Sequence, residues 1–348
     1  MGRQLLLTGI FTAFVLLLPL LALVGGPAQM QSQLAENASS QPAQPAAQSQ
    51  PGDQAPAAQA PVVAEPESYT LYDRGSGETF TVDARQLARG MLAAEMPPTF
   101  HPEALKAQAV AGHTYVSYLR RLREAAGQEG PDLECDAANW QSYTTQEAFY
   151  QRYGELADAY WQAICQAADQ VSAYLLTYQG QPILAAYCSM SNGQTEDAAN
   201  VWSAGLPYLT PVESFGDTLA PDYETQVTFT PQELSQAVAA AWPQLTLEGD
   251  PSGWLEVAAR SPSGYVTQVR LGEGLTVHGK ELRAALGLRS ADFDLGWDGQ
   301  VFTFTVRGYG HGVGFSQYGA DYMARQGATF DEILAHYYPG STLAMAAA

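Results

Sequence analysis

The chain has 348 residues, of which 46% are apolar and only 15% are charged, so it has ample material for a hydrophobic core. At about 150 residues per domain, this length predicts two globular units, or one domain with appendages. The 36 acidic side chains outnumber the 16 Lys and Arg residues and give a net charge of −20. This balance all but excludes a nucleic-acid partner, because phosphate backbones are bound mainly through Lys and Arg.

The first 26 residues are predicted to form a single-pass membrane anchor. Residues 5–24 are almost wholly apolar and uncharged, which is long enough for a helix that spans a bilayer. Arg3 precedes this run and the next basic residue is Arg74, so the N-terminus is expected in the cytoplasm and the rest of the chain outside the cell membrane. A cleaved signal peptide, with small residues from Gly25 onward as its cleavage site, is the alternative.

Residues 27–66 are predicted to be a disordered linker. The segment consists mainly of Gln, Ala, Pro and Ser, and it cannot bury enough apolar surface to offset the entropy lost on ordering. The amino-acid composition changes after this linker, and residues 67–343 are expected to form the extracytoplasmic folded region.

The folded region is predicted to contain both helices and strands. The expected elements are a hairpin over 69–82, helices over 84–94, 102–123 and 145–168, strands over 175–187 and 253–276, a helix opened by Thr230 and Pro231, a strand over 301–306 and a helix over 331–337. Because the helices and hairpin-like strands do not alternate as regular βαβ units, the sequence predicts an α+β fold, with helices and antiparallel strands around a substrate cleft.

The first segment with candidate catalytic or binding residues spans residues 89–115. Prolines 97 and 98 force a helix to end near Glu95, which lies among apolar side chains. A carboxyl group in such surroundings has a raised pKa, which suits a general acid. Lys106 and His113 are seven residues apart and share a face of the following helix. From spacing alone, a solvated Glu95 and an exposed Lys106 are the better interpretation.

The second segment is a polar turn that follows a strand. Residues 187–196 place Ser191, Asn192, Gly193 and Thr195 in one short stretch. Such a turn can offer several hydrogen-bond donors and acceptors to a sugar. An ordinary Asn-Gly turn explains the same residues, and alone it is the simpler interpretation.

The third segment, residues 308–320, has five glycines within twelve residues. Glycine is costly in entropy, so the backbone must need unusual dihedral angles or a close approach to another segment. The segment lacks the Lys and Ser/Thr of a phosphate loop and the spacing of a dinucleotide-binding loop. His311 lies within it, which makes it the strongest single signal in the chain.

Together these three segments resemble the stage II sporulation protein D family, which also contains amidase enhancers. The resemblance rests on E-M-P…A-L-K-A-Q-A-V-A-x-x-T-Y, then S-x-S-N-G-x-T-E, then G-Y-G-H-G-V-G-x-S-Q-Y-G-A, in that order. It covers roughly residues 69–343, including Leu286-Gly287-Leu288-Arg289-Ser290 and the closing run 333–340. An N-terminal membrane anchor is also typical of this family.

The resemblance implies a lytic transglycosylase that cleaves the bond between N-acetylmuramic acid and N-acetylglucosamine in peptidoglycan strands without stem peptides, during engulfment of the forespore. The catalytic acid of the family falls on Glu95, its lysine on Lys106, and its polar turn on residues 191–195. One carboxyl group suffices, because the C6 hydroxyl of the substrate replaces the second carboxylate that ordinary glycosidases need. The expected substrate-binding residues are Lys106, Gln108, His113, Ser191, Asn192, Gly193, Thr195, His311, Ser316 and Gln317.

The implied partners are peptidoglycan glycan strands, an amidase that strips stem peptides, and the engulfment complex. A non-catalytic amidase enhancer is the first alternative, and a wall-binding structural protein of the engulfment complex is the second. Retention of Glu95 favours the enzyme.

Two departures from the family pattern concern single residues. His113 stands where the family usually has arginine, which replaces a fixed charge by a titratable group. Some members bind zinc through two cysteines, of which only Cys135 is present here. One cysteine does not make a zinc site, so no metal and no cofactor are expected. Cys135, Cys165 and Cys188 are expected to be small buried side chains, although one disulfide is compatible with their number.

Overall fold

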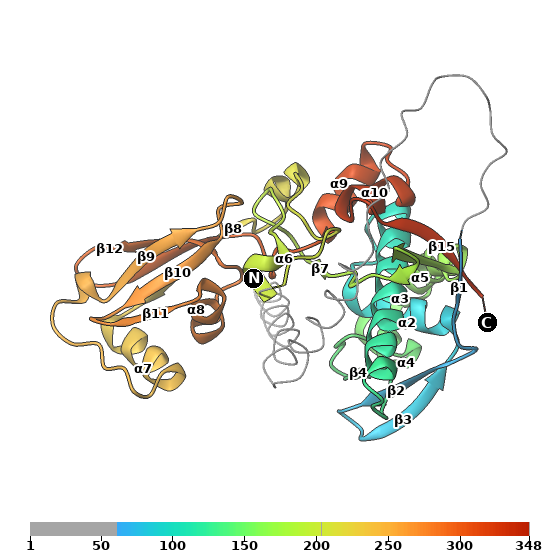
Figure 1. Cartoon of the computed structure of the whole chain (residues 1–348), viewed down its shortest axis with the longest axis horizontal. Coiled ribbons are helices and arrows are strands. Elements are labelled where there is room, and N and C mark those ends of the chain that lie inside the picture. The colour runs from blue at the N-terminus through green and yellow to red at the C-terminus, as the bar shows by residue number, and fades with distance from the viewer. Residues whose placement is uncertain (1–60, 203, 348) are drawn as a thin grey trace, which may run out of the picture.

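The computed structural model describes residues 61–202 and 204–347, so the predicted anchor and most of the predicted linker lie outside the described residues. Within the described part of the chain, no helix has both the length and the apolar character needed to cross a membrane. Figure 1 shows two lobes: a helical lobe formed mainly by residues 61–188 and 315–347, and a β-rich lobe formed by residues 224–307. The α+β prediction is confirmed.

Helices from distant parts of the chain surround the core of the helical lobe. They are α2 (Ala84–Glu95), α3 (Pro102–Ala125), α5 (Ala157–Val171), α9 (Gln317–Arg325) and α10 (Phe330–Tyr337). The long helix α3 is central and contacts all four others. Its buried Ala104, Ala107 and Ala111 have small side chains, so the neighbouring helices can approach closely.

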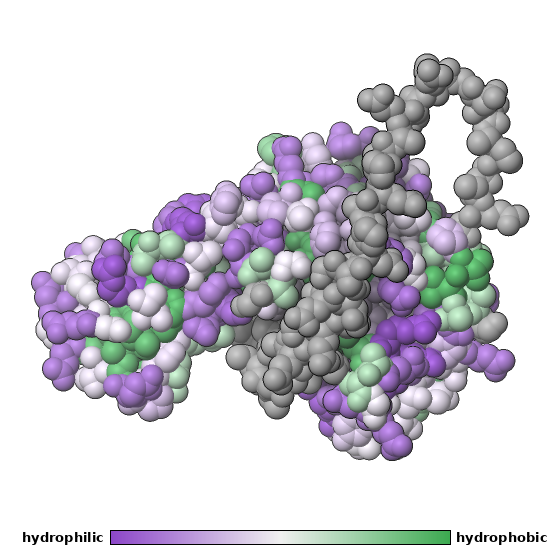
Figure 2. Space-filling model, viewed as in Figure 1, coloured by the Kyte–Doolittle hydropathy of each residue, from purple (hydrophilic) through white to green (hydrophobic). Residues whose placement is uncertain are grey.

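A sheet at the edge of this lobe joins the two ends of the described chain. Its strands, in spatial order, are β1 (Val62–Ala64), β15 (Thr342–Ala347), β5 (Tyr174–Tyr178) and β6 (Gln181–Pro182). β1 is parallel to β15, with Val62 opposite Met345. This sheet therefore includes residues before 67 and after 343, outside the range predicted for the folded region. Figure 2 shows apolar surface at this edge of a largely polar face.

The predicted hairpin over 69–82 is confirmed. It consists of β2 (Tyr69–Asp73) and β3 (Glu78–Val82), which are antiparallel, and β4 (Leu133–Cys135) runs parallel to β2. Asp73 stabilises the turn, because its carboxylate accepts hydrogen bonds from Gly75 N at 3.0 Å and Ser76 Oγ at 2.8 Å.

The β-rich lobe has a separate core between two three-stranded sheets. Its elements are β8 (Glu224–Phe229), α7 (Pro231–Ala241), β9 (Leu255–Arg260), β10 (Val266–Leu271), β11 (Leu275–Val277), α8 (Gly279–Leu286), β12 (Asp292–Trp297) and β13 (Phe302–Arg307). One sheet has the order β11-β10-β9 and the other β12-β13-β8. In β13, Phe302, Phe304 and Val306 alternate into the core, as the sequence predicts.

Short elements connect the two lobes. They are β7 (Tyr187–Cys188), α6 (Ala198–Trp202), the 3-10 helix η4 (Phe215–Leu219) and β14 (Phe315–Ser316). β7 and β14 are parallel, with Tyr187 opposite Phe315, so the second and third segments of the sequence analysis lie side by side. This pairing positions the candidate site.

The single helix predicted over 145–168 is wrong in one respect. The segment forms α4 (Gln146–Tyr153), a 3-10 turn over Gly154–Leu156, and then α5. Gly154, at the end of α4, has φ +54° and ψ −123°, a backbone conformation that favours glycine and does not continue an α-helix. Thr145 still caps the first helix, because its hydroxyl accepts a hydrogen bond from Ala148 N at 3.2 Å.

Candidate active site

Glu95 is the last residue of α2, and local sequence signals place it there. The helix starts with a capping box in which Asp83 and Gln86 bond to each other's backbone N–H groups at 2.7 and 3.0 Å. It ends because Met96, which precedes Pro97, is extended with φ −122° and ψ 143°. The carboxyl group of Glu95 therefore projects from a helix end that the prolines fix.

The pKa of Glu95 is raised from 4.5 to about 7, mainly because burial disfavours the charged form. A hydrogen bond from the side chain of Tyr187 acts in the opposite direction. Burial, together with nearby groups that include Glu95, raises the pKa of Tyr115 to about 12 and that of Tyr187 well above 10. The raised pKa of Glu95 agrees with the general-acid interpretation rather than with a solvated helix end, and two tyrosines accompany the carboxyl group.

His311 lies next to this cluster as a neutral ring. Its Nδ1 accepts a hydrogen bond from Val313 N at 3.0 Å, and the ring also bonds to the backbone of Tyr187. Burial first, and then the charge of Arg283, lowers the pKa of His311 to about 4. The ring packs edge-on against Trp202 with 5.2 Å between centroids. At neutral pH His311 can orient Tyr187, but it carries no charge.

The glycine-rich loop brings the backbone of the third segment onto the second. Gly308, Gly310, Gly312 and Gly314 all have positive φ angles, between 73° and 125°. A Cβ at Gly314 would collide with the carbonyl oxygen of Ala186. The sequence-based inference that these glycines allow unusual dihedral angles and close approach is confirmed.

Asp217, in η4, joins the second and third segments, and sequence reasoning missed it. One carboxylate oxygen accepts hydrogen bonds from the N and Oγ atoms of Ser191 at 2.8 and 2.6 Å, and the other accepts from Ser316 Oγ at 2.6 Å. Burial raises the pKa of Asp217, while these bonds favour its charged form. Ser191 and Ser316 thus have fully buried, internal partners.

The polar turn is largely saturated by bonds within the protein. Asn192 Nδ2 donates to Ser263 O at 2.7 Å and to Asp292 Oδ2 at 2.8 Å. Thr195 is buried and exchanges hydrogen bonds with the backbone of Val212, and its N–H donates at 2.8 Å. These residues hold the turn in place, and their predicted contact with a sugar stays a prediction.

Gly193 shares this structural role. Its backbone N donates to Ser191 Oγ at 3.1 Å and its carbonyl accepts from Ser214 N at 2.8 Å. Its φ of +104° favours glycine.

The predicted residues of α3 have separate partners. Lys106 Nζ pairs with Glu103 at 2.7 Å, on the same helix. Gln108 and Gln317 are brought together across the lobe, with Gln317 Nε2 3.3 Å from Gln108 Oε1. Gln317 and Ser316 directly follow Phe315 in β14, the partner of Tyr187. Gln108 and Gln317 therefore belong near the Tyr187 side of the site, whereas the Lys106 charge is already paired.

His113 is not part of the Glu95 cluster. Its Nε2 lies 2.6 Å from the hydroxyl of Tyr69 in β2, and the two rings pack edge-on. Burial lowers the pKa of His113 to about 4. The side chain is buried, which does not favour the predicted contact with substrate.

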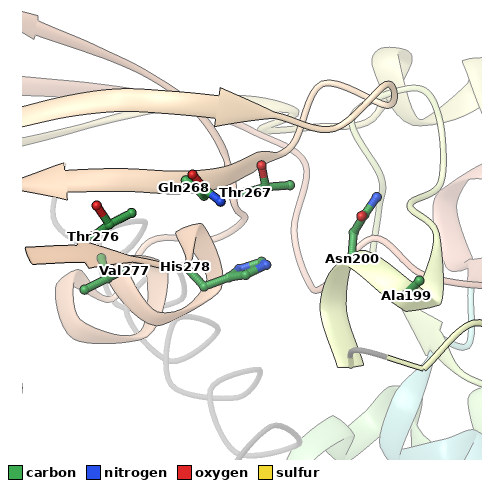
Figure 3. Close-up of a pocket in the computed structure, with 7 residues that line it drawn as sticks. All are labelled: Ala199, Asn200, Thr267, Gln268, Thr276, Val277 and His278. Carbon is green, nitrogen blue, oxygen red and sulfur yellow. The ribbon is translucent and has the colours of Figure 1, made fainter.

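Two pockets lie outside the Glu95 cluster. One, of about 300 Å³, is lined mainly by polar side chains from α6, β10 and β11, and His278 points from the end of β11 toward α6 (Figure 3). The other, of about 490 Å³, is lined in part by Tyr69 and His113. Glu95 lines neither pocket.

No group of three or more His, Cys, Asp or Glu side chains within the described ranges is arranged to hold a metal ion. The three cysteines are free thiols, and Cys135 and Cys188 are buried, whereas Cys165 is half-buried.

Three residues of the site were not identified from the sequence, and the local sequence signals for them differ. Tyr115 closes the first motif and Tyr187 opens the second, so both stood inside segments already singled out. Spacing along the chain cannot show that the Tyr187 hydroxyl bonds to Glu95 or that Tyr115 lies close enough to be affected by its charge. Asp217 had no local signal, because its partners Ser191 and Ser316 are 26 and 99 residues away.

Comparisons with known proteins place the chain in a family. A family model described as "Stage II sporulation protein" matches residues 72–178. Stage II sporulation protein D of Bacillus subtilis (strain 168) is 35% identical over 283 residues, which cover 81% of this chain and 80% of that protein. The Bacillus amyloliquefaciens protein of the same name is 35% identical over 275 residues, 79% of this chain and 78% of its own. The amidase enhancer of Bacillus subtilis (strain 168) is 28% identical over 306 residues, 73% of this chain and 40% of that protein.

Proposed function

Because the chain belongs to the stage II sporulation protein D family of sporulation proteins, we propose that it is a lytic transglycosylase acting on peptidoglycan. Its substrate is a glycan strand without stem peptides, and the bond cleaved joins N-acetylmuramic acid to N-acetylglucosamine. It acts from the outer side of the cell membrane, held by the N-terminal segment, during engulfment.

The observation that carries this proposal is the carboxyl group of Glu95, whose pKa of about 7 fits one group that must donate and then accept a proton near neutral pH. In the first half of the reaction, protonated Glu95 donates to the glycosidic oxygen as the bond to C1 breaks. In the second half, the Glu95 carboxylate takes the proton of the C6 hydroxyl, and the C6 oxygen forms a bond to C1. The product is a 1,6-anhydro sugar, and no water is consumed.

The other buried carboxylates near the lobe junction are poor candidates for a second catalytic group. Glu196 accepts hydrogen bonds from Asp197 N at 2.7 Å and Asn200 Nδ2 at 3.0 Å, and its other oxygen accepts from Ser261 Oγ. Both oxygens of Asp217 are also occupied. Hydrolysis by two carboxylates needs a second free acid or base, so this arrangement favours the single-carboxylate reaction.

Tyr187 is the positioning residue of this mechanism. Its hydroxyl bonds to Glu95 and stabilises the carboxylate that forms after proton donation. The neutral ring of His311, bonded to the Tyr187 backbone, orients the tyrosine in turn.

A second candidate function is enhancement of a separate amidase without glycan cleavage. It is favoured by the similarity to an amidase enhancer and by two exposed apolar side chains on η4, Phe215 at 52% and Leu219 at 61% exposure. In that case an amidase would dock on the protein, and Glu95 would have no chemical role.

Product analysis separates the two functions. The full-length protein is incubated with denuded glycan strands, and the products are identified by mass spectrometry beside those of Glu95→Gln. The proposal predicts 1,6-anhydro ends from the unsubstituted protein and none from the variant. Intact strands with both proteins, together with an amidase stimulated equally by both, would instead establish the enhancer.

A further inference from the structure

Two guanidinium groups beside the glycine-rich loop have no carboxylate partner. Most arginines of the described region pair with an Asp or Glu side chain, for example Arg89 with Asp169 and Arg307 with Asp294. Among the described residues, no carboxylate oxygen lies within 4.0 Å of a guanidinium nitrogen of Arg283 or Arg289. In a chain with 36 acidic residues, unpaired arginines at one place need a reason.

Arg289 is held in a defined orientation. Its guanidinium carbon lies 4.3 Å from the centroid of the Tyr309 ring, a cation–π contact. Nη1 donates to the carbonyl oxygen of Asp222 at 2.9 Å, and the Arg289 carbonyl accepts from Gly310 N at 2.9 Å. The side chain is therefore fixed to the third segment at both its backbone and its head group.

The remaining edge of this guanidinium is not satisfied by the protein itself. Nε is buried without a hydrogen-bond partner among the described residues, and Nη2 has none there either. Nε and Nη2 form the side of the arginine fork that binds a carboxylate through two parallel hydrogen bonds. An unsatisfied N–H of a charged group is costly, and a carboxylate bound at this edge would satisfy it.

Arg283 adds a second positive charge next to the same loop. Its side chain is only 7% exposed, and its Nε donates to Leu288 O at 3.2 Å. Its charge acts on both Tyr309 and His311. Burying an unpaired guanidinium is unfavourable, so the loop maintains a positive potential at some cost in stability.

Arg289 is also linked through Tyr318 to the segment that follows Glu95. Its charge acts on Tyr318, whose ring packs edge-on against Phe100 with 5.0 Å between centroids. Phe100 is five residues after Glu95. The exposed Asp222 also acts on Tyr318, but its carboxylate does not pair with Arg289. Tyr318 thus connects the neighbourhood of Arg289 with the chain segment that leads away from Glu95.

We propose that Arg289 binds the carboxylate of the lactyl group of an N-acetylmuramic acid residue through Nε and Nη2, while Tyr309 and the Asp222 carbonyl hold the guanidinium in place. This inference rests on the proposed function and adds the feature that the protein recognises. N-acetylglucosamine has no such carboxylate, so Arg289 distinguishes a peptidoglycan strand from a neutral glucosamine polymer. The site also attracts an anionic strand to a protein whose net charge repels it.

The test is a binding measurement with the full-length Glu95→Gln protein, which keeps the strands intact. Denuded strands are compared with the same strands after their lactyl carboxylates are converted to neutral amides. Amidation should weaken binding about 10- to 100-fold, the range expected for hydrogen bonds to a charged group. Adding Arg289→Met should cause a similar loss on carboxylate strands and little change on amidated strands, whereas Arg289→Lys should recover part of the affinity.

Arg270→Met is the matched control, because Arg270 is exposed and pairs with Glu256 at 2.5 Å in the same lobe. It should leave the affinity unchanged. Equal binding of the two strands by the protein without an Arg289 substitution would overturn the inference, even if Arg289→Met fails to fold. That result would leave the lytic transglycosylase proposal intact if 1,6-anhydro products still form. Failure of those products to form, with the carboxylate preference retained, would overturn the proposed reaction and leave the recognition site standing.

Discussion

At the scale of single residues, the chemistry of the site depends on the balance between burial and one hydrogen bond at Glu95. Burial raises the pKa of the carboxyl group, and the hydroxyl of Tyr187 opposes this effect. The net value of about 7 leaves acid and carboxylate in comparable amounts at neutral pH. A group that serves first as acid and then as base needs this balance.

Tyr187→Phe should raise the pKa of Glu95 above 7, because it removes the hydrogen bond and leaves the burial. The proposed reaction starts from protonated Glu95, so the fall in kcat/KM at high pH should move upward, by about 0.5–1 pH unit for one lost bond. The measurement is a pH profile of anhydro-product formation. Tyr208→Phe is the control, since Tyr208 is also in the core of the helical lobe but does not act on Glu95. If the fall in kcat/KM at high pH were unchanged in Tyr187→Phe, Tyr187 would not control the pKa of Glu95.

Glu95→Gln should change stability in a pH-dependent way. The folded protein holds a proton on Glu95 up to about pH 7, whereas an unfolded chain releases it near 4.5. Between these values the folded state binds more protons, so the contribution of Glu95 to stability falls as pH rises. The free energy of unfolding of the variant minus that of the unsubstituted protein should be about 2 kcal/mol more favourable to the variant at pH 8 than at pH 4. This figure is reduced because the Glu95 side chain is partly exposed.

Urea unfolding of both proteins at the two pH values measures this difference. His113 and His311 also titrate, but both proteins contain them, so their effect cancels. The same free-energy difference at both pH values would show that the Glu95 pKa is not raised in the folded protein.

At the scale of elements, helix ends and turns could be predicted from local sequence signals, whereas the pairing of strands far apart in the chain could not. The end of α2 at Glu95, the start of α3 at Pro102 and the β2–β3 hairpin follow from proline, capping and turn residues within a few positions. The pairing of β1 with β15 joins residues more than 270 positions apart, and the sequence of neither short strand identifies its partner. The break at Gly154 was missed because glycine is also tolerated within helices.

The candidate site shows the same division. The three motifs were found in the sequence, and their glycines were correctly assigned to close backbone approach. The polar turn was expected to face a sugar, yet Ser191 and Thr195 bond inward to Asp217 and Val212. Residue types reveal bonding capacity, whereas the direction of each side chain depends on strands that pair far along the chain.

The glycine loop allows a matched test of close approach. Gly314 and Gly299 both have positive φ, 73° and 97°, but only at Gly314 would a Cβ meet another part of the chain. Gly299→Ala should cost about 1 kcal/mol from the backbone conformation alone. Gly314→Ala should cost about 3 kcal/mol or more, because β7 and β14 must move apart. Thermal unfolding compares them, and equal losses would contradict the close-approach account.

At the scale of the whole molecule, the candidate site is assembled from both lobes. The helical lobe supplies Glu95 and Tyr115 on α2 and α3, and the β-rich lobe holds Arg283 and Arg289 against the glycine-rich loop. β7 and β14 link the two, and each lobe keeps its own apolar core. The site is therefore sensitive to changes at the lobe junction that leave both cores intact.

The ends of the described chain should contribute to the stability of the helical lobe. A protein that starts at Ser68 lacks β1, and it also lacks Glu65, which accepts hydrogen bonds from Tyr69 Oη and Ser117 Oγ at 2.9 Å each. Compared with a protein that starts at Pro61, it should lose about 1–3 kcal/mol, because the buried Ser117 hydroxyl loses its acceptor and Tyr69 keeps only its contact with His113. Urea midpoints measure the loss. Equal midpoints would mean that β1 is not part of the stable fold.

The claim that one carboxyl group performs the whole reaction is tested most directly by the source of the oxygen at the new chain end. Denuded strands are cleaved in water enriched in the heavy isotope of oxygen, and the products are weighed by mass spectrometry. Attack by the C6 hydroxyl predicts anhydro ends, one water lighter than hydrolysed ends and free of the label. Labelled reducing ends would show that water is the nucleophile, and a second acid or base would then have to act beside Glu95.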